Sequence, residues 1–303
     1  MKKGIISAEH MKERSAFAAL ALSLAATGLG QMYNGELARG AAFLLLRVMA
    51  VALIPVTMFS GGEGSLVRPV AALLALSAVV ALASIVEAAW CAARRESVPL
   101  ARYHRVPWYL AFGFASWLLT GLSLASLVPL LGLARAEDSR MEPSFAQGET
   151  VLVSWYRGKT LVPGDVVLVE RGGATRMGRV VALPGDTVRA REGSVQVNGA
   201  ALPAGVLSDD QAEALGVVNG ETLFYESNGG RRYAVYAKPE SMSAAPDAKN
   251  MRELPGGRYL LACDNRLEEN CFDEIEKSAV IAKVEGVVIG NYWRRMLFGG
   301  FVR

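Results

Sequence analysis

The sequence predicts an α-helical membrane domain, residues 1–134, followed by a mostly antiparallel β domain, residues 135–303. Residues 15–134 are almost all apolar, whereas the second half has the mixed composition of a globular domain. In that second half, short runs rich in β-branched residues alternate with turn signals, a pattern typical of antiparallel sheets. At 303 residues the chain is long enough to hold both units.

Three apolar segments are long enough to cross a bilayer, which takes about 20 residues. Residues 106–134 carry no charge, residues 69–93 contain only Glu87, and residues 40–59 contain only Arg47. Runs of this length exceed typical core helices, which favours membrane spans. The two charges fall at similar depths in neighbouring antiparallel spans, where unpaired charges are costly. We therefore expect an Arg47–Glu87 pair, with snorkelling of Arg47 to the headgroups as the alternative.

Residues 15–35 form a fourth apolar segment whose topology stays open. Its end runs into GLGQMYNGELARG, which resembles the glycine-rich turn of small two-span membrane modules. A full crossing would separate the basic N-terminus from the other basic loops, whereas a segment that enters and returns would keep them on one side. The segment is long enough for either.

The basic residues also predict the orientation of the chain. Loop 94–105 carries four arginines and should face the cytoplasm. The span 106–134 then delivers the β domain to the outer or periplasmic side of the cell (inner) membrane, and the protein is multi-pass. The C-terminal stretch 294–301 sets two arginines beside apolar residues, which is suited either to the bilayer surface or to capping of the β core.

Composition narrows the function further. A net charge of +3 gives no indication of a nucleic-acid partner. Three cysteines are too few for a disulfide scaffold, and we expect no metal and no other cofactor. Cys263 and Cys271 lie in the predicted outward-facing half, where an oxidising compartment permits a disulfide. Two buried free thiols are the alternative.

The expected strands are short runs between Gly-, Pro- and Asn-containing turns. They cover residues 150–156, 165–170, 179–183, 194–198, 231–237, 258–262 and 284–293. The turns contain Pro-Gly-Asp twice and Asn-Gly twice, which are strong breakers of regular structure.

Five segments of this half resemble, in order, the blocks of type I signal peptidases. They are MEPSFAQGETVLV (141–153), PGDVVLVE (163–170), GRVVALPGDTV (178–188), GSVQVNGAALP (193–203) and PGGRYLLACDNRLEENCFDE (255–274). The resemblance implies a signal-peptidase-type β domain behind a membrane anchor. It also implies signal peptides of exported preproteins and the lipid bilayer as partners, with cleavage after a small-x-small motif and no cofactor.

The resemblance implies a serine nucleophile before the Met-x-Pro motif and a neutral lysine as general base. Here Arg140 stands at the serine position and Gly178 at the lysine position. A guanidinium stays protonated and glycine has no side chain, so neither can act. Asp138 replaces a side chain that helps the family's oxyanion hole, and a carboxylate there would repel the developing charge. Met141 and Pro143 retain the substrate-binding positions.

Other family positions indicate a retained scaffold. The resemblance makes Arg179 a structural residue that pairs with Asp273, and it places Cys271 where the family has a serine that orients the lysine. The polar residues of the intervening turn are expected to stabilise it rather than to catalyse; they are Asp264, Asn265 and Arg266.

Three functions fit these residues. The first is a signal peptidase I-like membrane protein that processes or binds signal peptides but is impaired or inactive by the Ser/Lys mechanism. The second is an active enzyme that uses Ser139, one residue upstream, with an unrecognised base. The third is a non-enzymatic module of a membrane assembly. Without activity, another peptidase or a secretion component becomes a further possible partner.

Overall fold

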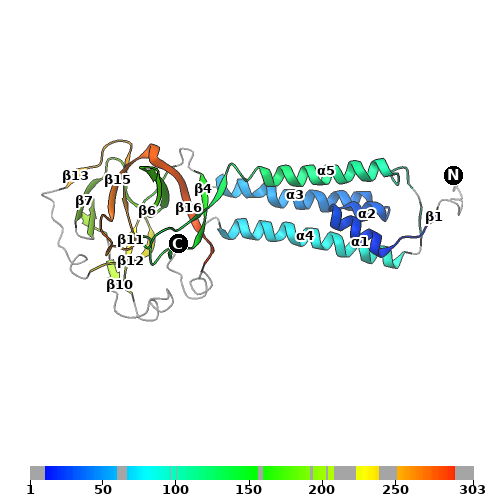
Figure 1. The fold of residues 1–303 in the computed structure, drawn as a ribbon, viewed down its shortest axis with the longest axis horizontal. Helices are drawn as coiled ribbons and strands as arrows, with labels where there is room; N and C mark the ends of the chain where they lie inside the picture. The colour runs from blue at the N-terminus through cyan, green and yellow to red at the C-terminus, as the bar shows by residue number, and fades with distance from the viewer. Residues whose placement is uncertain are drawn as a thin grey trace. The chain divides into compact units, whose positions relative to one another are not determined.

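The computed structural model describes residues 11–59, 67–95, 97–99, 101–155, 160–191, 194–202, 204–207, 223–238 and 251–290. The chain divides into two compact units, Met1–Leu130 and Leu131–Arg303 (Figure 1). The predicted bilayer contact at residues 294–301 lies outside the described residues.

The first unit is helical. Its elements are α1 (Ala16–Ala25), α2 (Leu29–Tyr33), α3 (Leu37–Phe59), α4 (Val67–Arg94) and α5 (Val106–Ala125), with a small pair of strands, β1 (Met11–Lys12) and β2 (Val98–Pro99). Three helical stretches are long and apolar enough to cross a membrane, Leu37–Thr57, Val67–Arg94 and Val106–Ala125, and they fall on the three segments for which spans are predicted. Large apolar side chains such as Val86 and Phe114 are exposed along them, as a lipid-facing surface requires.

The segment 15–35 folds back on itself. α1 has 10 residues, a length of about 15 Å, which is half the hydrocarbon core of a bilayer. The amide of Gly28 then donates to Ser84 Oγ (3.3 Å), whereas Asn34 Nδ2 donates to the carbonyl of Ala88, one turn further along α4 (2.7 Å). The chain therefore reverses at Gly28, and α1 and α2 form a short helical hairpin beside α4.

Glycine makes this reversal possible. Gly28 has φ +91°, a left-handed conformation that side chains disfavour. A Cβ on Gly28 would also overlap the carbonyl of Gly40 on α3, and a Cβ on Gly30 would overlap that of Ala19 on α1. The glycine-rich stretch thus allows the backbones of the hairpin and α3 to approach closely.

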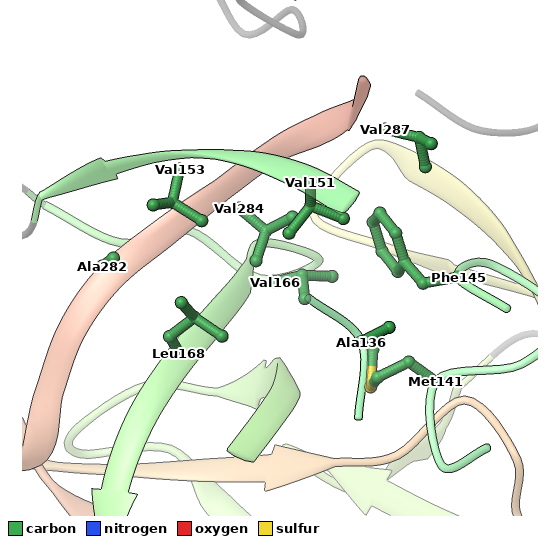
Figure 2. Packing of buried hydrophobic residues seen from close by; sticks show 10 residues of the cluster. All are labelled: Ala136, Met141, Phe145, Val151, Val153, Val166, Leu168, Ala282, Val284 and Val287. Atoms are coloured by element: carbon green, nitrogen blue, oxygen red, sulfur yellow. The ribbon is translucent and has the colours of Figure 1, made fainter. Parts of the chain in front are cut away.

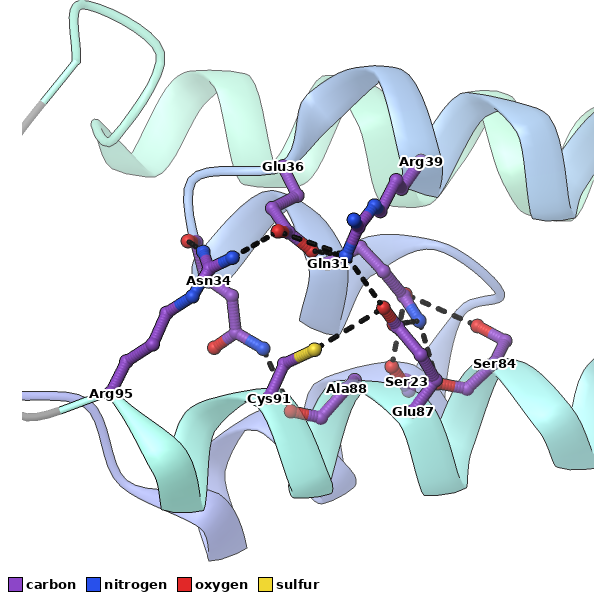
Figure 3. A network of polar contacts seen from close by, with 10 residues as sticks. All are labelled: Ser23, Gln31, Asn34, Glu36, Arg39, Ser84, Glu87, Ala88, Cys91 and Arg95. Carbon is purple, nitrogen blue, oxygen red and sulfur yellow. Dashed lines mark hydrogen bonds and ion pairs between the residues drawn. The ribbon is translucent and has the colours of Figure 1, made fainter.

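A polar network joins the hairpin to α4 (Figure 3). Gln31 is fully buried, and its Nε2 donates to the carbonyl of Ser84 (2.6 Å) and to Glu87 Oε2 (2.9 Å). The other oxygen of Glu87 accepts from Arg39 Nη1 and from Cys91 Sγ, both at 3.3 Å. These bonds satisfy polar groups that lipid could not.

The predicted Arg47–Glu87 pair is wrong. Arg47 Nη1 donates instead to Thr27 Oγ1 at the tip of the hairpin (2.5 Å). That tip lies just beyond the C-terminal end of α1, where unpaired carbonyls carry partial negative charge. The indole of Trp117 donates to one of these carbonyls, that of Ala25 (2.7 Å). The partner of Arg47 is therefore a hydroxyl of the hairpin and not the carboxylate of Glu87.

The second unit consists of antiparallel sheets, which confirms the predicted fold class. A seven-stranded sheet has the order β15-β14-β6-β5-β16-β4-β3. Its strands are β3 (Leu131–Arg135), β4 (Thr150–Trp155), β5 (Val166–Arg171), β6 (Ala174–Ala182), β14 (Arg258–Ala262), β15 (Phe272–Glu276) and β16 (Val280–Ile289). The apolar run 106–134 is thus divided, because α5 ends at Ala125 and the last residues pair with β4 as β3.

Two smaller sheets complete the described part of this unit. One has the order β13-β7-β8-β9 and the other β10-β11-β12. Their strands are β7 (Thr187–Arg191), β8 (Ser194–Val197), β9 (Ala200–Ala201), β10 (Ala204–Val206), β11 (Leu223–Asn228), β12 (Arg231–Tyr236) and β13 (Arg252–Glu253), and a 3₁₀ turn, Lys277–Ala279, precedes β16.

One hydrophobic cluster connects the large sheet to the segment after β3 (Figure 2). Met141 and Phe145 from that segment pack with alternate residues of β4, β5 and β16, including Val151, Val166 and Val284. Because side chains alternate along a strand, these valines share the face that the segment covers. The core therefore holds the backbone around Met141 in place.

Candidate active site

The segment at the expected nucleophile position is anchored on both sides. Before it, the amide of Ala136 donates to the carbonyl of Glu149 (2.9 Å). After it, Met141 and Pro143 are buried, and the amide of Phe145 donates to the carbonyl of Met141 (2.8 Å). The two residues that resemble substrate-binding positions thus secure the segment, while the residues just before them remain partly accessible.

The side chain of Arg140 is bound to a neighbouring loop. Its Nη2 donates to the carbonyls of Glu269 (2.9 Å) and Asn270 (2.6 Å). Its own carbonyl accepts from the amide of Asn265 (2.9 Å). The group at the nucleophile position therefore connects the site to this loop, and it has no lone pair for attack or for proton transfer.

The lysine position is closed by packing. Gly178 lies on β6 opposite Val167 of β5 and is buried. A Cβ built on Gly178 would lie 2.9 Å from Leu261 Cδ1 and 3.1 Å from Leu261 Cβ. The side chain of Leu261, on β14, thus occupies the space from which a lysine would have to extend.

The carboxylate of Asp138 accepts a hydrogen bond from a backbone amide that acyl-transfer chemistry would need as a donor. Its Oδ1 accepts from the amide of Arg140 (3.2 Å). The amide of the nucleophile residue is a typical oxyanion donor, which must point toward the developing charge. Here that donor is already engaged by a carboxylate.

Ser139 has an acidic neighbour. Its Oγ donates to Glu268 Oε1 (2.8 Å), and its carbonyl accepts from Asn265 Nδ2 (3.5 Å). Among the hydrogen bonds of the described residues, none joins Ser139 to a lysine or a histidine. Glu268 is thus the group in position to take a proton from this hydroxyl, and sequence reasoning missed it because no family motif marks it.

A groove of about 200 Å³ borders these residues, between the end of β3 and the start of β6. Its apolar lining residues are Ala134, Ala136, Met141, Leu168 and Met177, and its polar ones are Arg135, Glu137, Asp138, Thr175 and Arg176. Among the described strands, β3 pairs only with β4, and residues 174–178 of β6 pair only with β5, because β14 begins its pairing at Arg179. Two unpaired strand edges therefore flank the groove.

The sequence of this region settles the family. Residues 108–285 match the family model for signal peptidase, peptidase S26. The chain belongs to this signal peptidase family. Membership supports a signal peptidase I-like function, signal peptides as substrates and association with a membrane, and the three apolar helices agree with the last of these.

One solved structure of a signal peptidase I, from Enterococcus faecalis V583, is 24% identical to this chain. The alignment covers 43% of this chain and 98% of that one, with a TM-score of 0.23. No curated protein is significantly similar to the chain in sequence.

The predicted ion pair between Arg179 and Asp273 is wrong for this member of the signal peptidase family. Arg179 Nε donates to Asp264 Oδ1 (2.7 Å), and its guanidinium lies 4.0 Å from the centre of the Tyr233 ring. Arg179 faces the last residue of β14, so its side chain reaches the chain just past that strand. Asp273 lies one strand further away, on β15, and pairs with Arg171.

The neighbouring turn residues are also held by hydrogen bonds, which are buried in the case of Arg266. Arg266 Nη2 donates to Glu226 Oε2 (2.8 Å), and the amide of Arg266 donates to the carbonyl of Tyr236 (2.7 Å). Asn265 Oδ1 accepts from the amide of Leu267 (3.2 Å) within the turn.

Cys263 and Cys271 form a disulfide, as one of the two alternatives predicts, and are not a pair of buried free thiols. The resemblance had placed Cys271 where the family orients its lysine. That role is wrong here, because the sulfur is bonded to Cys263 and Gly178 offers no amine.

Three groups in the first unit lie close enough to suggest a metal site. The potential ligand atoms of Glu36, Glu87 and Cys91 are all within 4.8 Å of one another. Each already has a partner, because Glu36 accepts from Arg39 and Arg95, and Glu87 accepts from Arg39 and the Cys91 thiol. The polar network accounts for the cluster without a metal.

Proposed function

We propose that this member of the signal peptidase family binds signal peptides without cleaving them by the Ser/Lys mechanism. The observation that carries the proposal is the state of the two dyad positions. Arg140 is bonded into the loop at 269–270, and Leu261 fills the space beside Gly178. A serine hydroxyl is a poor nucleophile without a base, and this site has neither group at the expected place.

The oxyanion geometry supports the same proposal. Stabilising a tetrahedral intermediate needs donors that are free to turn toward it, and one such donor typically contributes 10²–10³-fold in rate. The amide of Arg140 is bonded to Asp138 instead. A developing oxyanion would therefore meet a carboxylate.

The groove supports retained peptide binding. An extended peptide can pair with the free edges of β3 and β6, since strand addition uses backbone groups that any sequence has. The floor, formed by Ala134, Ala136 and Met177 among others, would accept small apolar side chains. Neither feature depends on the missing dyad.

We further propose that the division near residues 130–134 separates a multi-pass anchor in the inner membrane from a domain on the outer or periplasmic side. The hairpin supports this arrangement. Ser15 bonds to Tyr33, and Glu36 bonds to Arg95, so both ends of the hairpin lie at the Arg95 end of α4. The basic segments thus gather at one end of the unit, and the positive-inside rule makes that end cytoplasmic.

The test uses the full-length protein in nanodiscs with a preprotein. We expect no cleavage, while an uncleavable signal peptide that carries a photocrosslinker labels the groove. Thr175→Trp, at an exposed position of the groove lining, would fill the groove and should remove the crosslink, whereas Arg189→Ala, on β7, should leave it unchanged. Cleavage by the wild-type protein would overturn the assignment as inactive. Absence of the crosslink would favour a non-enzymatic module of a membrane assembly, and co-purification would then look for a partner peptidase or secretion component.

One observation favours a second candidate, an enzyme that uses Ser139. Its hydroxyl already donates to Glu268 (2.8 Å). An ionised carboxylate is a weaker base than a neutral amine, and Asp138 would still oppose the oxyanion. If the wild-type protein cleaves, and Ser139→Ala and Glu268→Gln each abolish cleavage, this candidate replaces the first.

A further inference from the structure

The loop between Cys263 and Cys271 holds the segment with Ser139 and Arg140, which lies between two residues that line the groove. Backbone and side-chain contacts both contribute. The amide of Asn265 donates to the carbonyl of Arg140, and Arg140 Nη2 returns two bonds to the carbonyls at 269 and 270. Glu268 adds the bond from Ser139. Because Asp138 and Met141 line the groove on either side of these residues, the loop helps to set the shape of the groove.

The start of this loop is anchored independently of the disulfide. Asp264 forms a buried ion pair with Arg179, and Arg266 forms one with Glu226. Residues 267–270, in contrast, are exposed. At the end of the loop, the disulfide acts beside the pairing of β14 with β15 and one backbone bond, from the amide of Cys263 to the carbonyl of Cys271 (2.9 Å). Opening the disulfide would therefore loosen the part that holds Arg140 and Ser139, while the strand pairing and the buried ion pairs keep the fold of the unit.

We propose that the Cys263–Cys271 disulfide is a redox switch for peptide binding in the groove. This inference rests on the proposed peptide-binding function. In the oxidised protein the loop preorganises residues 138–141, so the peptide meets a formed groove and little ordering is needed on binding. In the reduced protein residues 267–270 gain freedom, the bonds to Arg140 weaken, and peptide affinity falls.

The reductant is a dithiol, of the class found in small molecules and in thioredoxin-like proteins. Its thiolate attacks one sulfur of the disulfide, and its second thiol resolves the mixed disulfide. The S–S bond of the protein receives two electrons and two protons and becomes two thiols. The dithiol becomes a disulfide, so no further oxidant or reductant is needed.

The experiment measures binding of a fluorescent signal peptide to the full-length protein in nanodiscs, before and after treatment with dithiothreitol. A hydrogen bond that involves a charged group stabilises a structure by about tenfold or more in an equilibrium constant, and the bonds of Arg140 stabilise the formed groove, so we expect reduction to raise the Kd about tenfold. Cys91→Ser should keep this response, because Cys91 is the free cysteine. The double variant Cys263→Ser with Cys271→Ser should bind the peptide weakly in both conditions. Arg140→Met should lose most of the change in Kd on reduction.

The outcomes separate this inference from the proposed function. No binding by the oxidised wild type would defeat the proposed function itself. Equal Kd values for the oxidised and reduced protein, with mass spectrometry confirming two new thiols, would overturn the switch alone. Resistance of the disulfide to the dithiol in the folded protein would overturn it as well. If the double serine variant does not fold, the two states of the wild type decide the question.

Discussion

Gly178→Ala tests whether packing has closed the position of the missing base. The added methyl would lie 2.9 Å from Leu261 Cδ1 and 3.1 Å from Leu261 Cβ. Leu261 is only 3% exposed and packs with Val180 and Val167, so it has little room to move. Overpacking of this kind costs about 1–3 kcal/mol. Replacing glycine also reduces the entropy of the unfolded chain, which offsets about 0.4–1 kcal/mol, so the overlap should dominate.

The assay is thermal unfolding of the β unit within the full-length protein, followed by near-UV circular dichroism. The middle of these two ranges gives a net cost of about 1.3 kcal/mol. A unit of this size loses about 2–4 °C per kcal/mol, so we expect the Tm to fall by roughly 3–5 °C. Gly256→Ala is the matched control, because a Cβ there meets nothing within 4 Å. Leu261→Ala alone should cost about 2–5 kcal/mol. The double variant should cost at least about 1 kcal/mol less than the sum of the single variants.

An unchanged Tm for Gly178→Ala, or costs that add within error, would refute the packing argument. The same argument bears on restoring activity. Arg140→Ser with Gly178→Lys supplies both dyad members, yet the lysine would have to displace Leu261. Cleavage of a preprotein is therefore expected only when Leu261 is shortened as well, and Asp138 would still limit the rate.

Three other predictions concern stability. Gln31→Leu should lower the Tm of the helical unit by more than an exposed Leu46→Ala does, since buried partners lose their hydrogen bonds at about 1–3 kcal/mol each; equal losses would contradict the role of the network. Tyr233→Phe should leave the Tm unchanged or raise it, because this hydroxyl is buried without a hydrogen-bond partner among the described residues, and burial raises its pKa well above the usual value; a clear loss would reveal a partner. The pKa of Glu274 is lowered, because hydrogen bonds from two arginines outweigh desolvation. The ionised carboxylate of Glu274 therefore stabilises the fold above its unfolded-state pKa, and this stabilisation is lost as the pH falls through the lowered folded-state pKa. The difference in Tm between wild type and Glu274→Gln should shrink below about pH 4 and persist at pH 7.

The architecture was predictable because it depends on local patterns. Long apolar runs predicted the three long apolar helices, and turn residues between short β-branched runs predicted the strands. The hairpin is not predictable from these patterns, because the length of residues 15–35 also permits a span. Its reversal depends on contacts between Gly28 and Ser84, which are 56 residues apart. No pattern of residue spacing carries that information.

The site was predictable in its chemistry and less so in its contacts. Arg140 and Gly178 could be placed from the motif alone, because the motif fixes which positions must carry a nucleophile and a base. The partner of Arg179 could not, because it depends on where β14 ends relative to β6. The contact between Ser139 and Glu268 joins residues 129 apart, and it depends on the path of the disulfide loop.

The hairpin beside α4 has a consequence for how the chain enters the membrane during synthesis. Asn34 finds its partner on α4 only after 54 further residues have been made. At about 5–20 residues per second, that takes roughly 3–11 s. During this time the amides of Gln31 and Asn34 lack their acceptors, so the segment should wait at the membrane surface. The hairpin should therefore settle beside α4 only after α3 and α4 have inserted, although it is made before them.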